Sequence, residues 1–263
     1  MTELILMCLA AGAVAGLLAG MFGVGGGLVI VPVLVAIFEI QGFDSGIHMH
    51  LALGSSLATI VMTSTSSVIA HHRKGAVDWS VFRLLAPGLV VGALLGAALA
   101  DFVSSETLRI AFGIGEILVA INMLRPKGST AGRTLPGGGG LSVAGGIIGT
   151  LAAMGGIGGG TFMVPYLSWC GMQMQRVVAT SAAGGLPIAI AGATGYAIAG
   201  WNNAALPDHS FGYLYLPGIL GIVCVSVVIA PLGAHLAHKL PTDKLKLAFA
   251  ALLAGLGIKL LFF

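Results

Sequence analysis

Charged residues are scarce in this chain. Of its 263 residues, 12 are Lys or Arg and 9 are Asp or Glu, so charged residues make up 8% of the chain, whereas about 25% is usual for a globular protein. So few charges could not keep a soluble domain in water. Hydrophobic residues make up 57% of the chain, and a further 42 residues are glycine. This composition predicts an integral membrane protein.

Dense basic tracts, metal-type cysteine spacing and strand-like alternation are missing as well. The net charge of +3 comes from scattered loop residues. The sequence therefore has no basic patch of the kind that binds nucleic acid. Three cysteines, Cys8, Cys170 and Cys224, are far apart in apolar sequence. We therefore expect them to be buried and to pack as small hydrophobic residues. A barrel strand would alternate apolar and polar residues. Unbroken apolar stretches of roughly 17 to 20 residues instead predict an all-α integral membrane protein, a polytopic helix bundle.

Ten apolar runs fall into two groups of five. The first group covers residues 4–22, 28–38, 51–70, 81–100 and 107–124, and the second covers 141–154, 161–171, 177–199, 213–234 and 245–262. Residues 125–140, between the groups, are rich in proline, glycine and charge, which is typical of a polar linker. We therefore expect a first transmembrane repeat over residues 1–124, a linker over 125–140 and a second transmembrane repeat over 141–263.

The two groups are copies of one another. Gly12–Leu34 and Gly145–Leu167 align without a gap and are identical at 12 of 23 positions. Both segments contain the motif GxGGGxxxxP, as Gly23–Pro32 and Gly156–Pro165. Chance does not give such a match, so the chain is an internal duplication.

Lysine and arginine are retained on the cytoplasmic side of short loops, so their positions predict the orientation of each half. In the first half the loop after the third run is basic, whereas in the second half the loop after the fourth run is basic instead. These residues are Arg73, Lys74 and Arg83 in the first half and Lys239, Lys244 and Lys246 in the second. Matching segments thus cross in opposite directions, which predicts two inverted repeats with both termini in the periplasm and a cytoplasmic linker.

Inverted repeats require an odd number of crossings in each half. The three later runs supply three crossings, so the glycine-rich opening must cross either twice or not at all. As a helix, residues 28–38 would rise about 16 Å, about half of the hydrocarbon thickness. We therefore expect each repeat to open with a glycine-rich helical hairpin whose arms meet near mid-membrane, followed by three transmembrane helices.

The hairpin tips are the main candidates for substrate binding. Their glycines are Gly25, Gly26 and Gly27 in the first half and Gly158, Gly159 and Gly160 in the second. Without side chains, several backbone N–H groups can point at one small oxyanion, and the following helix adds the positive end of its dipole. The alternative is that these glycines serve close helix packing, for which the four-residue spacing of Gly12, Gly16 and Gly20 is typical.

Hydroxyl side chains open the third run of each half. They are Ser55 and Ser56 in the first half and Thr180 and Ser181 in the second. Hydroxyl groups can hydrogen-bond an anion without adding charge, so these four are further substrate-binding candidates. The alternative is that they bond backbone carbonyls or pack helices.

Glu116 is the one acidic residue within an apolar run. A carboxyl group there is costly and is a functional candidate by default, so Glu116 is a candidate for proton coupling. The alternative is a structural hydrogen bond to a neighbouring helix.

The histidines do not predict a metal site. His48 and His50 lie before the third run, and His71 and His72 lie after it. The intervening run of about 20 residues spans about 30 Å as a helix, so the two pairs cannot share one ion. We expect them at the surface or the membrane interface.

The motif GxGGGxxxxP at Gly23–Pro32 and Gly156–Pro165, followed by Gly54-Ser55-Ser56 and Ala179-Thr180-Ser181, resembles the TauE/SafE family of sulfite exporters over essentially the whole chain. The resemblance implies a bacterial or archaeal inner-membrane carrier. Such a carrier exports small sulfur oxyanions or organosulfonates and is driven by a proton or other ion gradient.

We therefore predict a multi-pass secondary transporter, and not an enzyme, for a small sulfur-containing anion such as sulfite or an organosulfonate. Its partners would be the anion, the lipid bilayer and a proton or other coupling ion, and we expect no cofactor. A homo-oligomer is possible. The alternative is a membrane-embedded enzyme or sulfur-relay partner acting on the same compounds. Such a protein would carry conspicuous reactive groups, and the sequence offers three cysteines in apolar surroundings.

Overall fold

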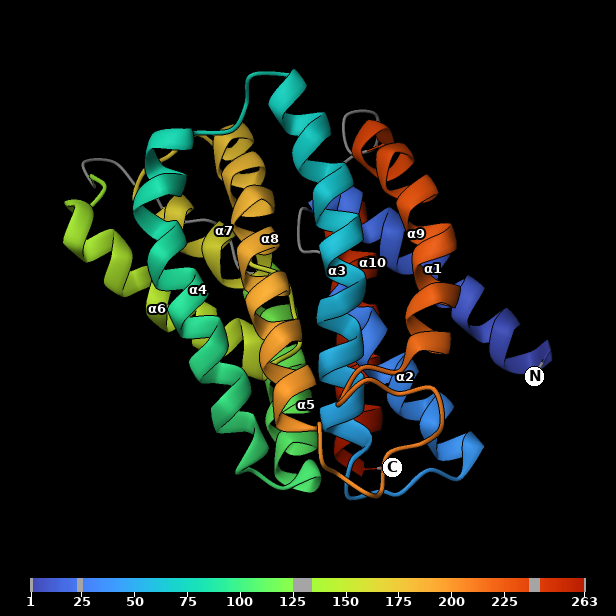
Figure 1. Ribbon diagram of the computed structural model, residues 1–263. Coiled ribbons are helices and arrows are strands. Elements are labelled where there is room, and N and C mark those ends of the chain that lie inside the picture. The colour runs from blue at the N-terminus through green and yellow to red at the C-terminus, as the bar shows by residue number, and fades with distance from the viewer. Residues whose placement is uncertain (1, 23–25, 125–133, 237–241, 263) are drawn as a thin grey trace.

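Nearly all of the described chain is helical. The computed structural model describes residues 2–22, 26–124, 134–236 and 242–262, which form ten helices, five in each half (Figure 1). In the first half they are α1 (Thr2–Phe22), α2 (Gly27–Gln41), α3 (His48–Arg73), α4 (Trp79–Asp101) and α5 (Ser105–Leu124). In the second half they are α6 (Gly138–Met154), α7 (Gly160–Trp169), α8 (Met174–Ala199), α9 (Leu216–Leu236) and α10 (Thr242–Phe262). The all-helical fold expected from the apolar runs is confirmed.

Five helices are long and apolar enough to cross a membrane. They are α3, α4, α5, α8 and, over Leu216–Gly233, α9. By contrast, α2 has 15 residues and α7 has 10, so at about 1.5 Å per residue they are about 22 Å and 15 Å long. Because the hydrocarbon core is about 30 Å thick, neither helix can cross it alone.

Helices α3 and α8 form the centre of the bundle (Figure 1). They contact each other. Helices α2 and α9 pack against α3, whereas α4 and α7 pack against α8. In the apolar windows of these two helices, 56% and 72% of the residues are buried, against 28% to 39% in α4, α5 and α9. The central pair is therefore the most shielded part of the bundle.

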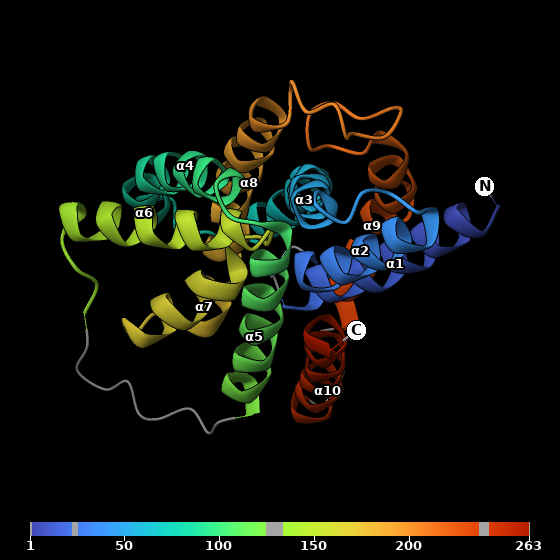
Figure 2. The ribbon, with the colours of Figure 1, turned by 90° about the horizontal axis from the view of Figure 1, so that it is seen from below.

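The first helix of each half packs against the fourth helix of the other half. Helix α1 packs on α9, and α6 packs on α4 (Figure 2). Glycines allow both contacts, because a Cβ on Gly12 would lie 2.5 Å from Ile222 O and one on Gly145 would lie 2.5 Å from Leu85 O. Gly92 of α4 likewise has no room for a Cβ against Gly146 O. The two halves therefore pack together through direct backbone contacts at glycine residues.

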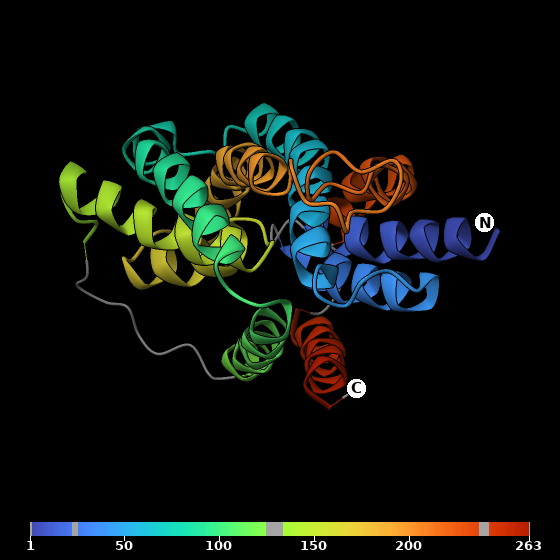
Figure 3. The same cartoon turned by 60° about the horizontal axis from the view of Figure 1, so that its bottom comes forward.

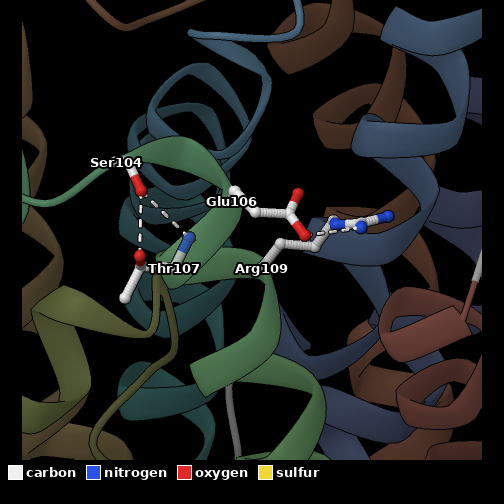
Figure 4. Close-up of polar contacts among 4 residues, drawn as sticks. All are labelled: Ser104, Glu106, Thr107 and Arg109. Carbon is white, nitrogen blue, oxygen red and sulfur yellow. Dashed lines mark hydrogen bonds and ion pairs between the residues drawn. The ribbon is translucent and has the colours of Figure 1, made fainter.

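Helices α5 and α10 pack side by side at one edge of the bundle (Figures 2 and 3). A Cβ on Gly257 of α10 would lie 2.8 Å from Gly113 O of α5. The first turn of α5 is capped by Ser104, whose Oγ accepts a hydrogen bond from Thr107 N at 3.2 Å (Figure 4). Arg109 forms an ion pair with Glu106 at 2.9 Å beside this cap (Figure 4).

The segment of residues 200–215 covers the N-terminal half of α3. Tyr215 N donates a hydrogen bond of 2.8 Å to Ser55 Oγ, and Gly54 has no room for a Cβ against Tyr213 O. Burial raises the pKa of Tyr213, and its hydroxyl accepts a hydrogen bond from Asn203 Nδ2 at 3.1 Å. This end of the central helix pair is therefore closed by tightly packed loop backbone.

The expected location of the histidines is wrong for one pair. His48 and His50 are buried, because both rings bind main-chain carbonyl groups. His48 Nε2 lies 2.9 Å from Phe43 O, and His50 Nε2 lies 3.0 Å from Ala100 O at the C-terminal end of α4. Among the cysteines, Cys8 and Cys170 are buried as expected, whereas the expectation is wrong for Cys224, which is exposed.

Candidate functional site

The turn between α6 and α7, Gly156–Gly160, is here called the second glycine tip. Gly156 has φ +58°, and a Cβ on it would lie 2.8 Å from Leu53 Cα. Glycine is required there for both reasons. Gly156 N and Ile157 N donate hydrogen bonds to the last carbonyl groups of α6, at Ala153 and Ala152, so the chain leaves that helix with its backbone satisfied.

The two tips lie against each other. Gly27, the first residue of α2, would place a Cβ 2.6 Å from Gly156 O and 2.8 Å from Ile157 Cα. Gly26 precedes it with φ +79° and is packed against Ala15. Gly25, the third candidate in the first tip, lies outside the described residues. The described part of the first tip therefore supports the second tip by direct backbone contact.

The second glycine tip carries N–H groups without a partner. Ile157 N is bonded to α6, and the next N–H group along the chain with a backbone partner is Met163 N, which donates to Gly159 O at 2.8 Å. Within the described residues, the N–H groups of Gly158, Gly159 and Gly160 donate no hydrogen bond. All three residues are buried. The first N–H groups of a helix have no partner within it, and here they belong to buried residues, so they are available to a ligand.

Two hydroxyl groups beside these N–H groups are also unpaired. Thr161 is the second residue of α7, and its Oγ1 is buried without a partner in the described structure. The Oγ of Ser181, on α8, is buried without a partner as well, in a side chain with 0% exposure. A buried polar group without a partner costs about 1–3 kcal/mol. The structure thus leaves several hydrogen-bond donors unsatisfied in one region.

Gly185 of α8 brings the tip and the central helices together. A Cβ on Gly185 would lie 3.2 Å from Ser64 Oγ of α3 and 3.4 Å from Gly159 N. Ser181 lies one helical turn before Gly185 and therefore on the same face of α8, the face turned toward Gly159. The position of Gly185 is therefore bounded by the Gly159 N–H group and by a hydroxyl group of α3.

The other predicted hydroxyl groups are bonded within the protein. Ser55 Oγ accepts from Tyr215 N, and Ser56 Oγ donates to Gly156 O at 2.7 Å. Thr180 Oγ1 accepts from Asp78 N at 2.9 Å. In the described structure these three groups hold loops and the second glycine tip in place. Ser181 alone of the four predicted hydroxyls is unpaired.

Glu116 lies at the contact between α5 and α10, away from the tips in the contacts that the structure describes. Its side chain is 1% exposed, and neither carboxyl oxygen has a hydrogen-bond partner. A Cβ on Gly257 of α10 would lie 3.2 Å from Glu116 Cβ. The expected structural hydrogen bond to a neighbouring helix is not formed in the described structure.

The electrostatics of the site come from backbone and hydroxyl dipoles. The N-terminus of α7 places the positive end of its helix dipole at the second glycine tip. The neighbours that the structure describes around this tip include Leu53 and Met163, which are apolar. Donors without acceptors in apolar surroundings suit a ligand that is small, rich in acceptor atoms and negatively charged.

Sequence reasoning missed Thr161, Ser64 and Gly185. Thr161 directly follows the glycine motif, but the matching residue of the first half is Leu28, so a search for features repeated in both halves passes over it. Ser64 lies among several serine and threonine residues of α3. Nothing in that local pattern separates it from its neighbours, because the contact that distinguishes it comes from α8.

Comparison with known proteins gives a consistent result over the whole chain. A family model described as "Sulfite exporter TauE/SafE" matches residues 8–260. A probable membrane transporter protein of Haemophilus influenzae is 37% identical over 265 residues, which cover 99% of each chain. A probable membrane transporter protein of Methanocaldococcus jannaschii is 27% identical over 257 residues, or 95% of this chain and 92% of the relative. No solved structure matches the chain.

The unequal bonding of Ser56 and Ser181 gives a stability test. Ser56→Ala removes the donor to Gly156 O and leaves a buried carbonyl unpaired, which should cost about 1–3 kcal/mol and lower the thermal unfolding midpoint in detergent. Ser181→Ala removes an unpaired buried hydroxyl, so without substrate the midpoint should stay equal or rise. A matched loss of stability in Ser181→Ala would show that its hydroxyl is bonded and would remove it from the site.

Proposed function

The chain belongs to the sulfite exporter TauE/SafE family, and we propose that it exports a small sulfur-containing anion, sulfite or an organosulfonate, across the inner membrane. It is a multi-pass membrane transporter of this family and not an enzyme. The alternative of a membrane-embedded enzyme or sulfur-relay partner is therefore set aside. The anion is held at mid-membrane by backbone N–H groups of the glycine tips.

The observation that carries this proposal is the set of buried, unpaired donors at the second glycine tip. The N–H groups of Gly158, Gly159 and Gly160 and the hydroxyls of Thr161 and Ser181 lack partners in the described structure. An oxyanion such as sulfite or a sulfonate offers three oxygen acceptors on one centre and can accept from several of these donors at once. The positive end of the α7 helix dipole at the tip also favours an anion over a cation.

The inverted arrangement of the two repeats, residues 1–124 and 141–263, is part of the proposal. It is supported by the exchange of partners between halves, since α1 packs on α9 as α6 packs on α4. It is also supported by the reversed distribution of Lys and Arg in the loops. In transporters of this kind the substrate site lies near the bilayer midplane, and the repeats rock around it to give alternating access.

We assign proton coupling to Glu116. Its carboxyl group is buried between α5 and α10 without a hydrogen-bond donor or an ion-pair partner in the described structure. Burying an unpaired carboxylate is costly, so the group is stable there when it carries a proton. It would bind a proton when reached from one side and release it to the other.

Filling the space beside Gly159 should weaken substrate binding. Gly185→Ala adds a methyl group 3.2 Å from Ser64 Oγ and 3.4 Å from Gly159 N, a tight position that a folded protein can absorb. If one hydrogen bond to the anion is lost, affinity should fall by about 10- to 150-fold, or about 1.5–3 kcal/mol. Uptake into proteoliposomes, measured with sulfite, sulfate, thiosulfate, sulfoacetate and taurine, identifies the substrate and measures the loss.

The matched control is Gly115→Ala, because a Cβ on this helical glycine of α5 meets nothing within 4 Å. It should transport like the wild type. A Gly185→Ala protein that is folded and binds substrate with wild-type affinity would show that the anion does not approach the second glycine tip.

Glu116→Gln should uncouple transport from the proton gradient. The amide keeps the size of the carboxyl group but cannot take up or release a proton, so uptake driven by a pH gradient should be abolished while substrate exchange without a gradient continues. Both assays use the same proteoliposomes. Undiminished gradient-driven uptake in the variant would exclude Glu116 as the proton carrier.

The inverted topology predicts opposite accessibility for two loops that occupy matching positions in the halves. Single cysteines at Gly75 and Ala205, in a background without native cysteines, should react with a membrane-impermeant thiol reagent from opposite faces, Ala205 from the periplasm. Labelling of both positions from the same face of intact cells would contradict the inverted repeats.

A further inference from the structure

Every polar group at the second glycine tip is electrically neutral. The donors are the N–H groups of Gly158–Gly160 and the hydroxyls of Thr161, Ser181 and Ser64. The remaining described contacts of the tip are with apolar side chains and with backbone. Neither lysine nor arginine is among these contacts, so within the described structure an anion at this tip has no counter-charge.

The described cations that share helices with the site lie at the helix ends. Arg176 precedes Gly185 by nine residues on α8, and Arg73 follows Ser64 by nine residues on α3, so each is about 13 Å along the helix from the site. Arg176 is itself paired with Asp78 at 3.6 Å. On α5, Arg109 is paired with Glu106 (Figure 4). Arg73 and Arg176 can attract anions to one mouth of the protein, but none of these cations neutralises an anion at the tip.

Most titratable side chains of the helices around the tip lie near the helix ends, as does Glu39 on α2. On α3 they lie within the first three and last three residues, from His48 to His50 and from His71 to Arg73. On α8 they are Arg176 and Tyr196, α7 carries Tyr166, and α6 carries none. The exception is Tyr196, whose hydroxyl donates to Ala153 O at 3.3 Å beside the tip, but a tyrosine hydroxyl is neutral near pH 7. The charge of the protein groups around the tip therefore does not change over the neutral pH range.

A neutral site in apolar surroundings discriminates by the charge of its ligand. The cost of removing an ion from water rises with the square of its charge, so a dianion costs about four times as much as a monoanion of the same size. The attraction of fixed N–H and O–H dipoles rises only in proportion to the charge. A monoanion therefore gains more than it loses at such a site, whereas a dianion of equal shape does not.

We propose that the second glycine tip selects monoanions and rejects dianions of the same shape. This inference rests on the proposed function and specifies its substrate. Alkanesulfonates satisfy the rule at every pH near neutrality. Sulfite satisfies it as hydrogen sulfite, HSO₃⁻, which loses its second proton near neutral pH. Sulfate, a dianion of similar size, is excluded.

Three ligands of similar size separate charge from shape. Methanesulfonate is a monoanion throughout the neutral range, sulfate is a dianion, and methylphosphonate changes from monoanion to dianion within that range. Binding to the purified full-length protein in detergent is measured by calorimetry at several pH values. Methanesulfonate should bind with constant affinity, and sulfate should bind at least about tenfold more weakly. The apparent affinity for methylphosphonate should fall with its monoanionic fraction as pH rises.

The constant binding of methanesulfonate controls for any titration of the protein itself. Equal affinity for sulfate and methanesulfonate, or pH-independent binding of methylphosphonate, would overturn charge selection while leaving the anion site in place. If none of the three ligands binds to the folded protein, but sulfite or an organosulfonate is carried, the site lies elsewhere and the inference fails. Absence of both binding and transport contradicts the proposed function itself.

A matched pair of variants locates the selection at the tip. Thr161→Ala should weaken methanesulfonate binding by about 10- to 150-fold, because it removes one hydrogen bond to the anion. Thr194→Ala should bind like the wild type, because Thr194 is exposed on α8 and its Oγ1 donates to Ile190 O within its own helix at 2.8 Å. Equal binding in the two variants, with both proteins folded, would remove Thr161 from the site.

Discussion

In the hydrocarbon core of a membrane, every backbone N–H and carbonyl group must find a partner within the protein. This constraint shapes the two interruptions of the helical fold. At the second tip the chain leaves α6 with Gly156 N and Ile157 N bonded to its last carbonyls, and Gly156 O accepts from Ser56. The N–H groups of Gly158, Gly159 and Gly160 are the exception, because in the described residues they remain unpaired. An interruption with three adjacent N–H groups left free at the start of a helix suits an acceptor-rich ligand.

Close helix packing keeps this interruption away from lipid. Helix α1 crosses α9 and α6 crosses α4 at positions where glycine removes the side chain, as at Gly12 and Gly92. Each half thus buries its first helix against the other half, and neither half could form the central pair α3 and α8 alone. Because packing in a membrane gains little from hydrophobic burial, such close backbone approach supplies much of the attraction. The same packing brings Gly27 against Gly156 and fixes the tip near the middle of α8.

Features repeated along the chain were predictable from the sequence, and features that depend on distant partners were not. Apolar run lengths predicted the helices and the short arms α2 and α7, because run length and helix length follow from the same chain geometry. The state of each hydroxyl group was not predictable: Ser55 is bonded by Tyr215 N, 160 residues away, and Thr180 by Asp78 N, 102 residues away. The burial of His50 likewise depends on Ala100 O, 50 residues away.

A duplicated chain starts with two equivalent sites, yet the polar groups of this protein are unequal between its halves. Thr161 stands at the tip of the second half where the first has Leu28, and Glu116 stands in the first half where the second has Leu253. The glycine contacts that build the scaffold, in contrast, recur in both halves, as at Gly12 and Gly145. Packing therefore retains the symmetry of the duplication, whereas the groups that meet substrate and proton depart from it. Such a division suits one anion at one tip, because two equivalent neutral sites in contact would place two like charges side by side in a medium that screens them poorly.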